Sequence, residues 1–437
     1  LHLCDRRQRQ MCIRDSTMVI SSKIKCEICD SSFYIKYQMD QLIYQYPWNL
    51  DFYCPDCGDR IHVTFCKNGL NCKSEKGDNG GKAYMLGYSS CLPITKEMYL
   101  PLTEEADRRL FFSPFFNLSR KYSNQNYDVI QKHGNFISAI SANILPYRSS
   151  LLQLLPLLNK QNMKPEAYTK KMAKAFNIDS YRKGLSTYTD CVAHYAELVE
   201  CCYTNLKPNT PASSPYGILF NDLMVFASDM DKNELRILKD ELNQYYSLKE
   251  WLVKNAFSYI AKIISKIEKY FPAMFYGVTE EHTCPHSNQL YLVTINDEEV
   301  NADYSSGYEV IEKILPIVVA LENKLSRGDI NAFEDDRYSM DQFMKLTVGM
   351  RVKALQQNDV LKTYFLNSLN NKIRNGETHD NSHYDSEHQI CRYIDFNNPN
   401  NMVEIPLMDV AFMTYIQFIR IMEIALVVNK ILQRIWN

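Results

Sequence analysis

The stretch Asn358 to His379, NDVLKTYFLNSLNNKIRNGETH, joins a regular helical pattern to a short polar segment with an arginine and a histidine. Its apolar residues recur every four positions, which gives a helix one buried face. Asn358 is a suitable N-cap, and Asn375-Gly376 is a natural pair at which a helix ends. The stretch therefore predicts one helix followed by a polar loop. The residues of the expected buried face are Leu361, Phe365, Leu369 and Ile373.

Arg374 and His379 are the two residues of this stretch that suggest chemistry. An arginine can hold a phosphate, and a histidine can move a proton near neutral pH. A purely structural interpretation stays open, because an arginine in the last helical turn also complements the helix dipole. Spacing alone does not decide between the two.

The surrounding sequence predicts a helical domain from about residue 300 to the end. Helices are expected at 308–325 and 340–355, and a β-hairpin at 388–396 and 402–407 around an Asn-rich turn. A long helix from about Met408 closes the chain. Its apolar stripe is expected to face a core or a partner and consists of Ala411, Tyr415, Phe418, Met422, Ala425, Val428 and Leu432.

The motif Arg-Asn-x-x-x-His, formed by Arg374, Asn375 and His379, resembles that of the HEPN superfamily, and the resemblance covers roughly residues 300–437. Members of that superfamily are four-helix nucleotide- or RNA-binding domains, and many are ribonucleases. The resemblance implies a homodimer formed through the C-terminal helices, with RNA held where two motifs meet. It also implies an endoribonuclease of a prokaryotic stress or phage-defence system.

The implied reaction needs no metal, because the nucleophile is the ribose 2′-hydroxyl next to the scissile phosphate. His379 is expected to act as general base or acid, for which an unperturbed pKa of about 6.5 is suitable. Arg374 is expected to stabilise the charge that develops on the phosphorane-like transition state. Asn375 is expected to orient the helix end or to hydrogen-bond the phosphate, and the product is a 2′,3′-cyclic phosphate.

Two Cys-x-x-Cys pairs near the N-terminus predict a zinc ribbon. Tight turns let both thiolates of each pair reach one tetrahedral ion, and an all-cysteine ligand set leaves no open position for catalysis. Strands are expected after each pair, at 33–37 and 60–65, with an enlarged loop between them. The expected ligands of this structural zinc are Cys26, Cys29, Cys54 and Cys57. Cys66, Cys72 and Cys91 follow at less regular spacing, and a second metal site is the less favoured interpretation of these three.

Residues 95–295 predict helices, with the clearest patterns at 151–158, 188–203 and 234–270. The first of these is either one buried helix or two short ones broken at Pro156. Residues 209–215 predict a linker, and a strand is expected at 289–295. His133 and His194 are expected to have packing or surface roles, and Cys191, Cys201 and Cys202 to be small core residues. His282, Cys284 and His286 form a possible metal cluster, but a polar loop at a domain boundary is preferred.

Composition narrows the functional class. The 437 residues suggest two or three domains, and only 14 glycines argue against Gly-rich phosphate loops. A formal charge of −2 gives no overall electrostatic signal for nucleic acid. No membrane segment is expected, since charged residues interrupt the apolar 415–436 stretch. The 14 cysteines are best explained as reduced thiols of a cytoplasmic protein with a metal site.

Four segments are expected. Residues 1–16 resemble a translated sequencing adapter and are excluded from the fold. Residues 17–94 form the zinc ribbon, 95–295 a helical middle region, and 296–437 the HEPN-like domain. The expected fold is mainly α with a small β zinc ribbon and a C-terminal four-helix bundle carrying a short β-hairpin insertion. The alternative function is a non-catalytic scaffold that binds nucleic acid or protein through the ribbon, while its C-terminal helices only dimerise.

Overall fold

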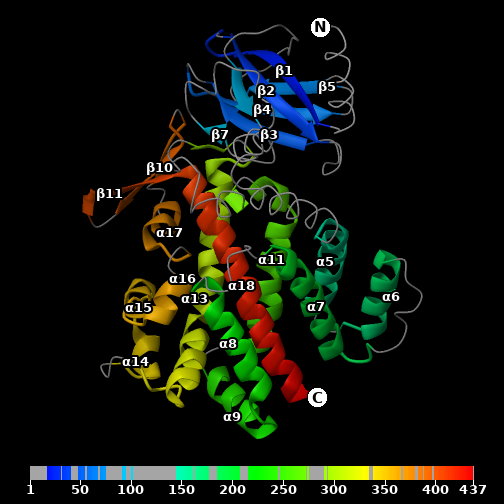
Figure 1. Ribbon diagram of the computed structural model, residues 1–437, viewed down its shortest axis with the longest axis vertical. Helices are drawn as coiled ribbons and strands as arrows, with labels where there is room; N and C mark the ends of the chain where they lie inside the picture. Colours follow the sequence, from blue (N-terminus) through cyan, green and yellow to red (C-terminus); the bar gives the residue numbers. More distant parts are fainter. Residues whose placement is uncertain are drawn as a thin grey trace, which may run out of the picture. The chain divides into compact units, whose positions relative to one another are not determined.

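The structure is a computed structural model, and the chain groups into two compact units, each assembled from separate segments (Figure 1). Unit 1 contains residues 1–137, 267–301 and 379–412, and unit 2 contains residues 138–266, 302–378 and 413–437. The structure describes residues 17–30, 32–40, 48–54, 57–66, 69–74, 91–94, 100–101, 144–160, 163–176, 185–206, 215–244, 247–271, 273–274, 290–292, 294–333, 338–365, 368–378, 382–386, 388–395 and 398–436. The adapter-like segment, His133 and the 209–214 part of the linker lie outside these residues, and the expected domain ranges stay a prediction.

Unit 2 is helical, which agrees with the mainly α fold expected from the sequence. Its first helices are α5 (Leu145–Leu158), α6 (Pro165–Phe176), α7 (Tyr188–Leu206), α8 (Pro215–Asp229) and α9 (Lys232–Asn243). A continuous helical stretch follows, made of α10 (Leu248–Glu250), the π-helical segment η3 (Trp251–Ala256) and α11 (Phe257–Ile264). The later helices are α13 (Asp297–Arg327), α14 (Met340–Lys345), α15 (Val348–Leu355), α16 (Asp359–Phe365), α17 (Asn371–Thr378) and α18 (Leu407–Trp436). The first turns of α13 and α18 belong to unit 1.

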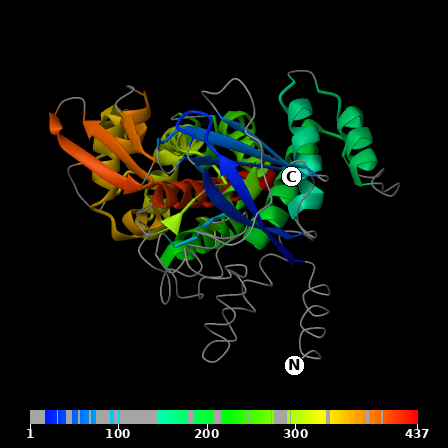
Figure 2. The ribbon, with the colours of Figure 1, turned by 90° about the horizontal axis from the view of Figure 1, so that it is seen from above.

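Unit 1 contains the described strands, in four small sheets. The first has the order β1 (Thr17–Lys25), β2 (Ser32–Asp40), β6 (Cys91–Ile94), and the second β3 (Trp48–Tyr53), β4 (Arg60–Cys66), β5 (Gly69–Ser74). The third pairs β7 (Leu100–Pro101) with β8 (Leu290–Tyr291). The fourth has the order β11 (Asn398–Pro406), β10 (Ile390–Asp395), β9 (Ser382–Asp385), which lie side by side in Figure 2. The strands expected after each cysteine pair are therefore present as β2 and β4. A short 3₁₀ turn, η4 (Ile267–Tyr270), also belongs to this unit.

The C-terminal sheet confirms the expected hairpin and adds a third strand, β9, to it. Gln389 anchors this sheet to the segment before α13. Its side-chain amide accepts from the backbone N–H of Leu292 at 2.7 Å and donates to the Leu292 carbonyl at 2.8 Å. The Gln389 side chain thus satisfies both backbone groups of Leu292, as a neighbouring strand would, and it connects two parts of the chain that are 97 residues apart.

Helix α18 forms the centre of the unit 2 core and runs among α8, α13 and α16 in Figure 1. All seven residues of its predicted apolar stripe are buried, as expected. By length and composition it is also the one helix of the described part of the chain that is apolar enough to cross a membrane. In its most apolar window 89% is buried inside the fold, and a core helix passes the same test, so this is weak evidence for a membrane span.

The single helix predicted from Asn358 onward is wrong, because the chain breaks between α16 and α17. Asn358 is the N-cap, as predicted, and its Oδ1 accepts from the Leu361 N–H at 2.9 Å. The helix stops at Phe365, and α17 restarts at Asn371 and continues through Gly376 to Thr378. The cause is tertiary, since the hydroxyl of Tyr304 accepts from the backbone N–H of Asn370 at 2.6 Å. The predicted helix end at Asn375-Gly376 also differs, because α17 continues to Thr378.

Three other predicted elements differ from the structure. The helix expected at 340–355 is divided at Leu346, which has an extended backbone, into α14 and α15. The helix expected at 234–270 is divided between α9 and α10, where Ser247 caps the second part. The strand expected at 289–295 is reduced to the two residues of β8. In contrast, α5 continues through Pro156 as one helix, of which only one face is buried.

Candidate functional site

The four predicted metal ligands of unit 1 lie together. The Sγ atoms of Cys26, Cys29, Cys54 and Cys57 are all within 4.8 Å of one another. Two of these distances cross between the two pairs, with 3.6 Å from Cys26 to Cys57 and 3.7 Å from Cys29 to Cys54. A tetrahedral ion with metal–sulfur bonds of about 2.3 Å places its sulfurs about 3.8 Å apart. The cluster therefore has the size and donor set of a closed tetrahedral metal site.

Both cysteine turns have the same backbone design. The N–H of the residue after each second cysteine donates to the carbonyl of the first, from Asp30 to Cys26 at 3.1 Å and from Gly58 to Cys54 at 2.9 Å. Asp30 and Gly58 have positive φ, 60° and 69°. Glycine has no Cβ penalty in that region, and aspartate is among the residues that tolerate it. The sequence thus selects two equivalent turns that each present a pair of thiols.

The thiol environment favours a bound cation. Burial raises the pKa of Cys26, and burial together with the neighbouring cysteine thiols raises the pKa of Cys57 to about 12. Four thiolates this close repel one another, and a divalent cation removes that repulsion. Cys26 and Cys54 are buried, whereas Cys29 and Cys57 are exposed at the rim. The cluster can therefore hold a metal ion.

The second cysteine turn contacts other parts of unit 1. A Cβ on Gly58 would lie 3.3 Å from Oγ of Ser386, in the turn between β9 and β10. Arg60, at the start of β4, forms a 3.2 Å ion pair with Glu298 in the first turn of α13. The second cysteine turn therefore lies against the turn between β9 and β10, and the strand that follows it is joined to the start of α13.

The arginine of the predicted catalytic motif lies in α17 of unit 2. Arg374 is half-buried, Asn375 is exposed, and Nη1 of the arginine donates to Oδ1 of the asparagine at 3.3 Å. His379 lies outside the described residues, directly after the last residue of α17. The structure thus places two of the three predicted residues next to each other, and the role of the histidine stays a prediction.

The start of α17 is fixed by two tyrosines of α13. Tyr304 accepts from the N–H of Asn370 and donates to the Ser368 carbonyl at 3.3 Å. One turn later, the buried Tyr308 donates to Oδ1 of Asn371. Burial, together with the negative charge of Glu312, raises the pKa of Tyr308, and the positive charge of Arg374 opposes this rise. No periodic pattern in the sequence indicates these contacts, because they form between side chains of α13 and a segment more than 60 residues further along the chain.

The other predicted residues have the following positions. Cys66, Cys72 and Cys91 lie in β4, β5 and β6, and the arrangement of their side chains is outside the described residues, as are His282, Cys284 and His286. His194 has a packing role, as predicted, since it is buried with its Nδ1 3.2 Å from the hydroxyl of Tyr168. Cys191 and Cys202 are core residues, as predicted, whereas Cys201 is only half-buried.

A buried polar cluster in the core of unit 2 was missed by the sequence analysis. The carboxylate of Glu423 in α18 accepts hydrogen bonds from Tyr203 at 2.9 Å, Tyr364 at 2.8 Å and Arg420 at 2.5 Å. The guanidinium carbon of Arg420 lies 4.2 Å from the centre of the Tyr364 ring. Both charged residues are only 2% exposed. Their i, i+3 spacing is typical of an ion pair on a solvent-exposed helix surface, so the sequence pattern did not predict that Arg420 and Glu423 are buried.

Comparisons with known proteins leave the family open. No protein-family model matches the chain. No curated protein and no solved structure matches it either.

Proposed function

We propose that this protein is a metal-independent endoribonuclease whose site contains Arg374, Asn375 and His379. One observation carries the proposal: a half-buried arginine and an exposed asparagine are in contact on a short helix that ends directly before the histidine. The contacts of α13 with Asn370 and Asn371 support it, because they hold in place the start of the helix that carries Arg374. Precise placement of charged donors is what electrostatic catalysis requires.

The proposed mechanism follows from the chemistry of the three side chains. His379 removes the proton of the ribose 2′-hydroxyl, and the resulting oxygen attacks the adjacent phosphorus. The 5′-oxygen leaves as the phosphodiester bond breaks, and it receives a proton from the second histidine of a dimer. Arg374 stabilises the added negative charge on the phosphoryl oxygens, and Asn375 orients the guanidinium or the phosphate. The products are a 2′,3′-cyclic phosphate and a 5′-hydroxyl.

The assignment is tested by incubating the purified full chain with single-stranded RNA. The wild type should cut the RNA, and Arg374→Ala and His379→Ala should each abolish the cutting. The matched control is His383→Ala, because His383 is an exposed histidine of β9 outside the motif. A substrate with 2′-deoxyribose throughout should resist cleavage. Equal cutting by the wild type and the Arg374→Ala/His379→Ala double variant would sink the assignment.

The Cys4 cluster is proposed to hold a structural zinc ion. Its support is the all-thiol donor set and the tetrahedral size of the cluster. Zinc bound here has no open coordination position, so it stabilises the small sheets of unit 1 and takes no part in the reaction.

A second candidate function is a non-catalytic binding module. It is favoured by the acidic residues beside the motif, Glu377 and Asp380, which repel a phosphate. In this case the zinc-containing unit binds nucleic acid or protein, and the C-terminal helices only dimerise. RNA binding that survives both motif substitutions, without any cleavage by the wild type, would establish this alternative.

A further inference from the structure

The stretch from the end of α5 through α6 has an excess of positive charge, although the whole chain has a formal charge of −2. Residues 159–176 contain five lysines and one acidic residue, Glu166, which gives a net charge of +4 and leaves −6 for the rest of the chain. All five lysines are exposed. They are Lys160, Lys164, Lys170, Lys171 and Lys174. Unit 2 therefore has a locally basic surface that the overall charge conceals.

The apolar side of α6 is fixed inside unit 2. The helix packs against α5 and α7, and Figure 1 shows it at the outer edge of the helices of this unit. Tyr168 and Met172 are fully buried on this side. The hydroxyl of Tyr168 lies 3.2 Å from Nδ1 of His194 in α7. These contacts hold α6 in one orientation, with its opposite side toward solvent.

This opposite side is a lysine face formed by Lys170, Lys171 and Lys174. Successive helical residues are about 100° apart, so the three lysines fall within one arc of about 100°, away from the buried side. Lys174 is three and four residues after the other two, and like charges at these spacings repel one another. In the described part of the chain no carboxylate pairs with them, that of Glu166 included. An anion beside the lysine face therefore lowers an electrostatic energy that the protein leaves uncompensated.

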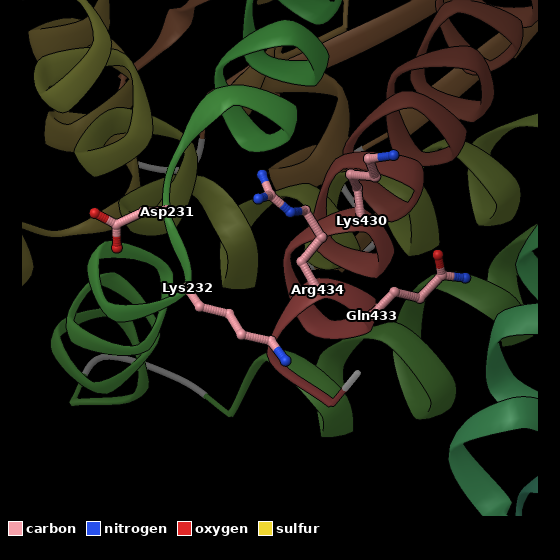
Figure 3. Close-up of a pocket in the computed structure, with 5 residues that line it drawn as sticks. All are labelled: Asp231, Lys232, Lys430, Gln433 and Arg434. Atoms are coloured by element: carbon pink, nitrogen blue, oxygen red, sulfur yellow. The ribbon is translucent and has the colours of Figure 1, made fainter.

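The open cavity between the α8–α9 turn and the end of α18 shows a different arrangement of charge (Figure 3). The side chains of Lys232 and Lys430 both line this cavity, but they point apart in Figure 3. The guanidinium of Arg434 donates to the carbonyl of Ala227 at 2.9 Å, so its hydrogen-bonding capacity is partly used within the fold. Positive charge is thus dispersed in this part of unit 2, whereas it is concentrated on α6.

The side chains around the lysine face indicate the kind of partner. A helix that lies on a membrane carries Trp, Phe or Leu beside its basic residues. Protein interfaces are enriched in aromatic side chains and depleted in lysine. None of the exposed large apolar side chains of the described residues lies on α6. Exposed lysines without apolar neighbours are instead suited to the phosphate backbone of a nucleic acid, which binds through charge neutralisation.

We propose that the lysine face of α6 binds the phosphate backbone of single-stranded RNA, with Lys160 and Lys164 extending the positive surface toward α5. Backbone contacts of this kind position a nucleic acid without reading its sequence. In Figure 1, α6 and α17 lie on opposite sides of unit 2, so the lysine face holds RNA away from the proposed cleavage motif. The choice of RNA as the partner rests on the proposed function, whereas the surface itself contains neither Arg374 nor His379.

The test uses the full chain and a fluorescein-labelled 12-mer of 2′-O-methyl-oligouridine, which lacks the 2′-hydroxyl that the proposed cleavage needs. The variant Lys170→Gln/Lys171→Gln/Lys174→Gln removes the charge, and glutamine has nearly the helix propensity of lysine. The variant Lys170→Arg/Lys171→Arg/Lys174→Arg keeps the charge. Fluorescence anisotropy measures binding at several salt concentrations.

The matched control is Lys232→Gln/Arg236→Gln/Lys430→Gln, an equal loss of charge on α9 and α18. The Kd of the wild type should rise tenfold or more in the glutamine variant of α6, but less than twofold in the arginine variant and in the control. The loss of three phosphate contacts should also lower the slope of log K against log salt by about 2, at about 0.7 for each contact with a single strand.

The proposal is overturned if the wild type does not bind the RNA probe, if the glutamine variant of α6 binds as tightly as the wild type, or if the control weakens binding equally. Wild type that binds phosphatidylserine vesicles but not the RNA probe would overturn it in favour of a membrane. Failure of the proposed function is a separate result. A protein that binds the probe through α6 but cuts no RNA contradicts the cleavage reaction alone, and one that cuts RNA but binds it without the lysines contradicts the lysine face alone.

Discussion

The hydroxyl of Tyr308 in α13 donates a hydrogen bond to Oδ1 of Asn371, the first residue of α17. Asn371 is also confined from another side, since a Cβ on Gly349 of α15 would lie 3.0 Å from its Nδ2. Arg374 is three residues further along, on the same side of the helix. The contact between Tyr308 and Asn371 therefore sets the position from which α17 presents Arg374 and Asn375.

Tyr308→Phe should lower the free energy of unfolding by about 1 kcal/mol, the net contribution of one buried hydrogen bond. Asn371→Ala removes the same bond, so the two substitutions should be strongly non-additive. Urea denaturation of the wild type, both single variants and the double variant gives the coupling energy. Effects that simply add would show that the two side chains do not interact in solution.

Gly307→Ala should destabilise unit 2, although alanine is the better helix former by about 1 kcal/mol. A Cβ at this position of α13 would lie 2.4 Å from Oε1 of Gln417 and 2.5 Å from the hydroxyl of Tyr259. Both neighbours are buried, so overpacking of about 1–3 kcal/mol should exceed the gain in propensity. Glu309→Ala, at an exposed position of the same helix, is the control and should be nearly neutral. Thermal unfolding that shows Gly307→Ala to be as stable as the wild type would mean that α11 and α18 do not approach α13 this closely.

One metal ion should be bound per chain, and Cys54→Ser should lose it. Metal binding requires thiolates, and it supplies folding free energy to the small sheets described in unit 1. Elemental analysis of freshly purified protein measures the metal, and hydrogen exchange measures protection of residues 17–74. Cys201→Ser is the control, because Cys201 is a half-buried thiol of α7 outside the cluster. Protein that is folded and free of metal as purified would contradict the assignment.

The sequence correctly predicted the elements whose structure is determined by residues close together in the chain. The cysteine turns need only a few neighbouring residues, and α18 carries its buried stripe over its whole length. The break between α16 and α17 was not predictable, because the four-residue apolar pattern continues through it. It depends on Tyr304, more than 60 residues away, which competes for the backbone of Asn370.

The same reasoning applies to the candidate sites. Cys-x-x-Cys spacing fixes its own local geometry, so the four cysteines that lie close together could be predicted from the sequence. The buried cluster around Glu423, by contrast, joins residues up to 220 positions apart, and no spacing rule connects them. Likewise, the sequence indicated Arg374 as a candidate residue but gave no indication of its neighbour Tyr308, since a tyrosine in an amphipathic helix has no feature that distinguishes a positioning role from a packing role.

Lowering the pH from 7.5 to 5.5 should reduce the stability of unit 2 through His194. Burial lowers the pKa of this histidine below its usual value of about 6.5. Between the lowered pKa and pH 6.5 the unfolded chain therefore binds more protons than the folded chain, and acidification favours unfolding. His194→Gln, which can keep a hydrogen bond to Tyr168, should show a smaller loss of stability over the same pH range. Chemical denaturation at several pH values measures the difference, and identical pH profiles for the two proteins would refute it.

Glu423→Gln should be the most damaging of these substitutions. The change leaves the guanidinium of Arg420 buried without its counter-charge, and removing one partner of a buried ion pair costs about 3–5 kcal/mol. Arg420→Met/Glu423→Met removes both charges together and keeps similar volume, so it should recover much of this loss, although the hydroxyls of Tyr203 and Tyr364 then lack their shared acceptor. Urea denaturation compares the three proteins. A double variant that is less stable than Glu423→Gln would show that the tyrosine hydrogen bonds, and not the ion pair, make the larger contribution to the core around α18.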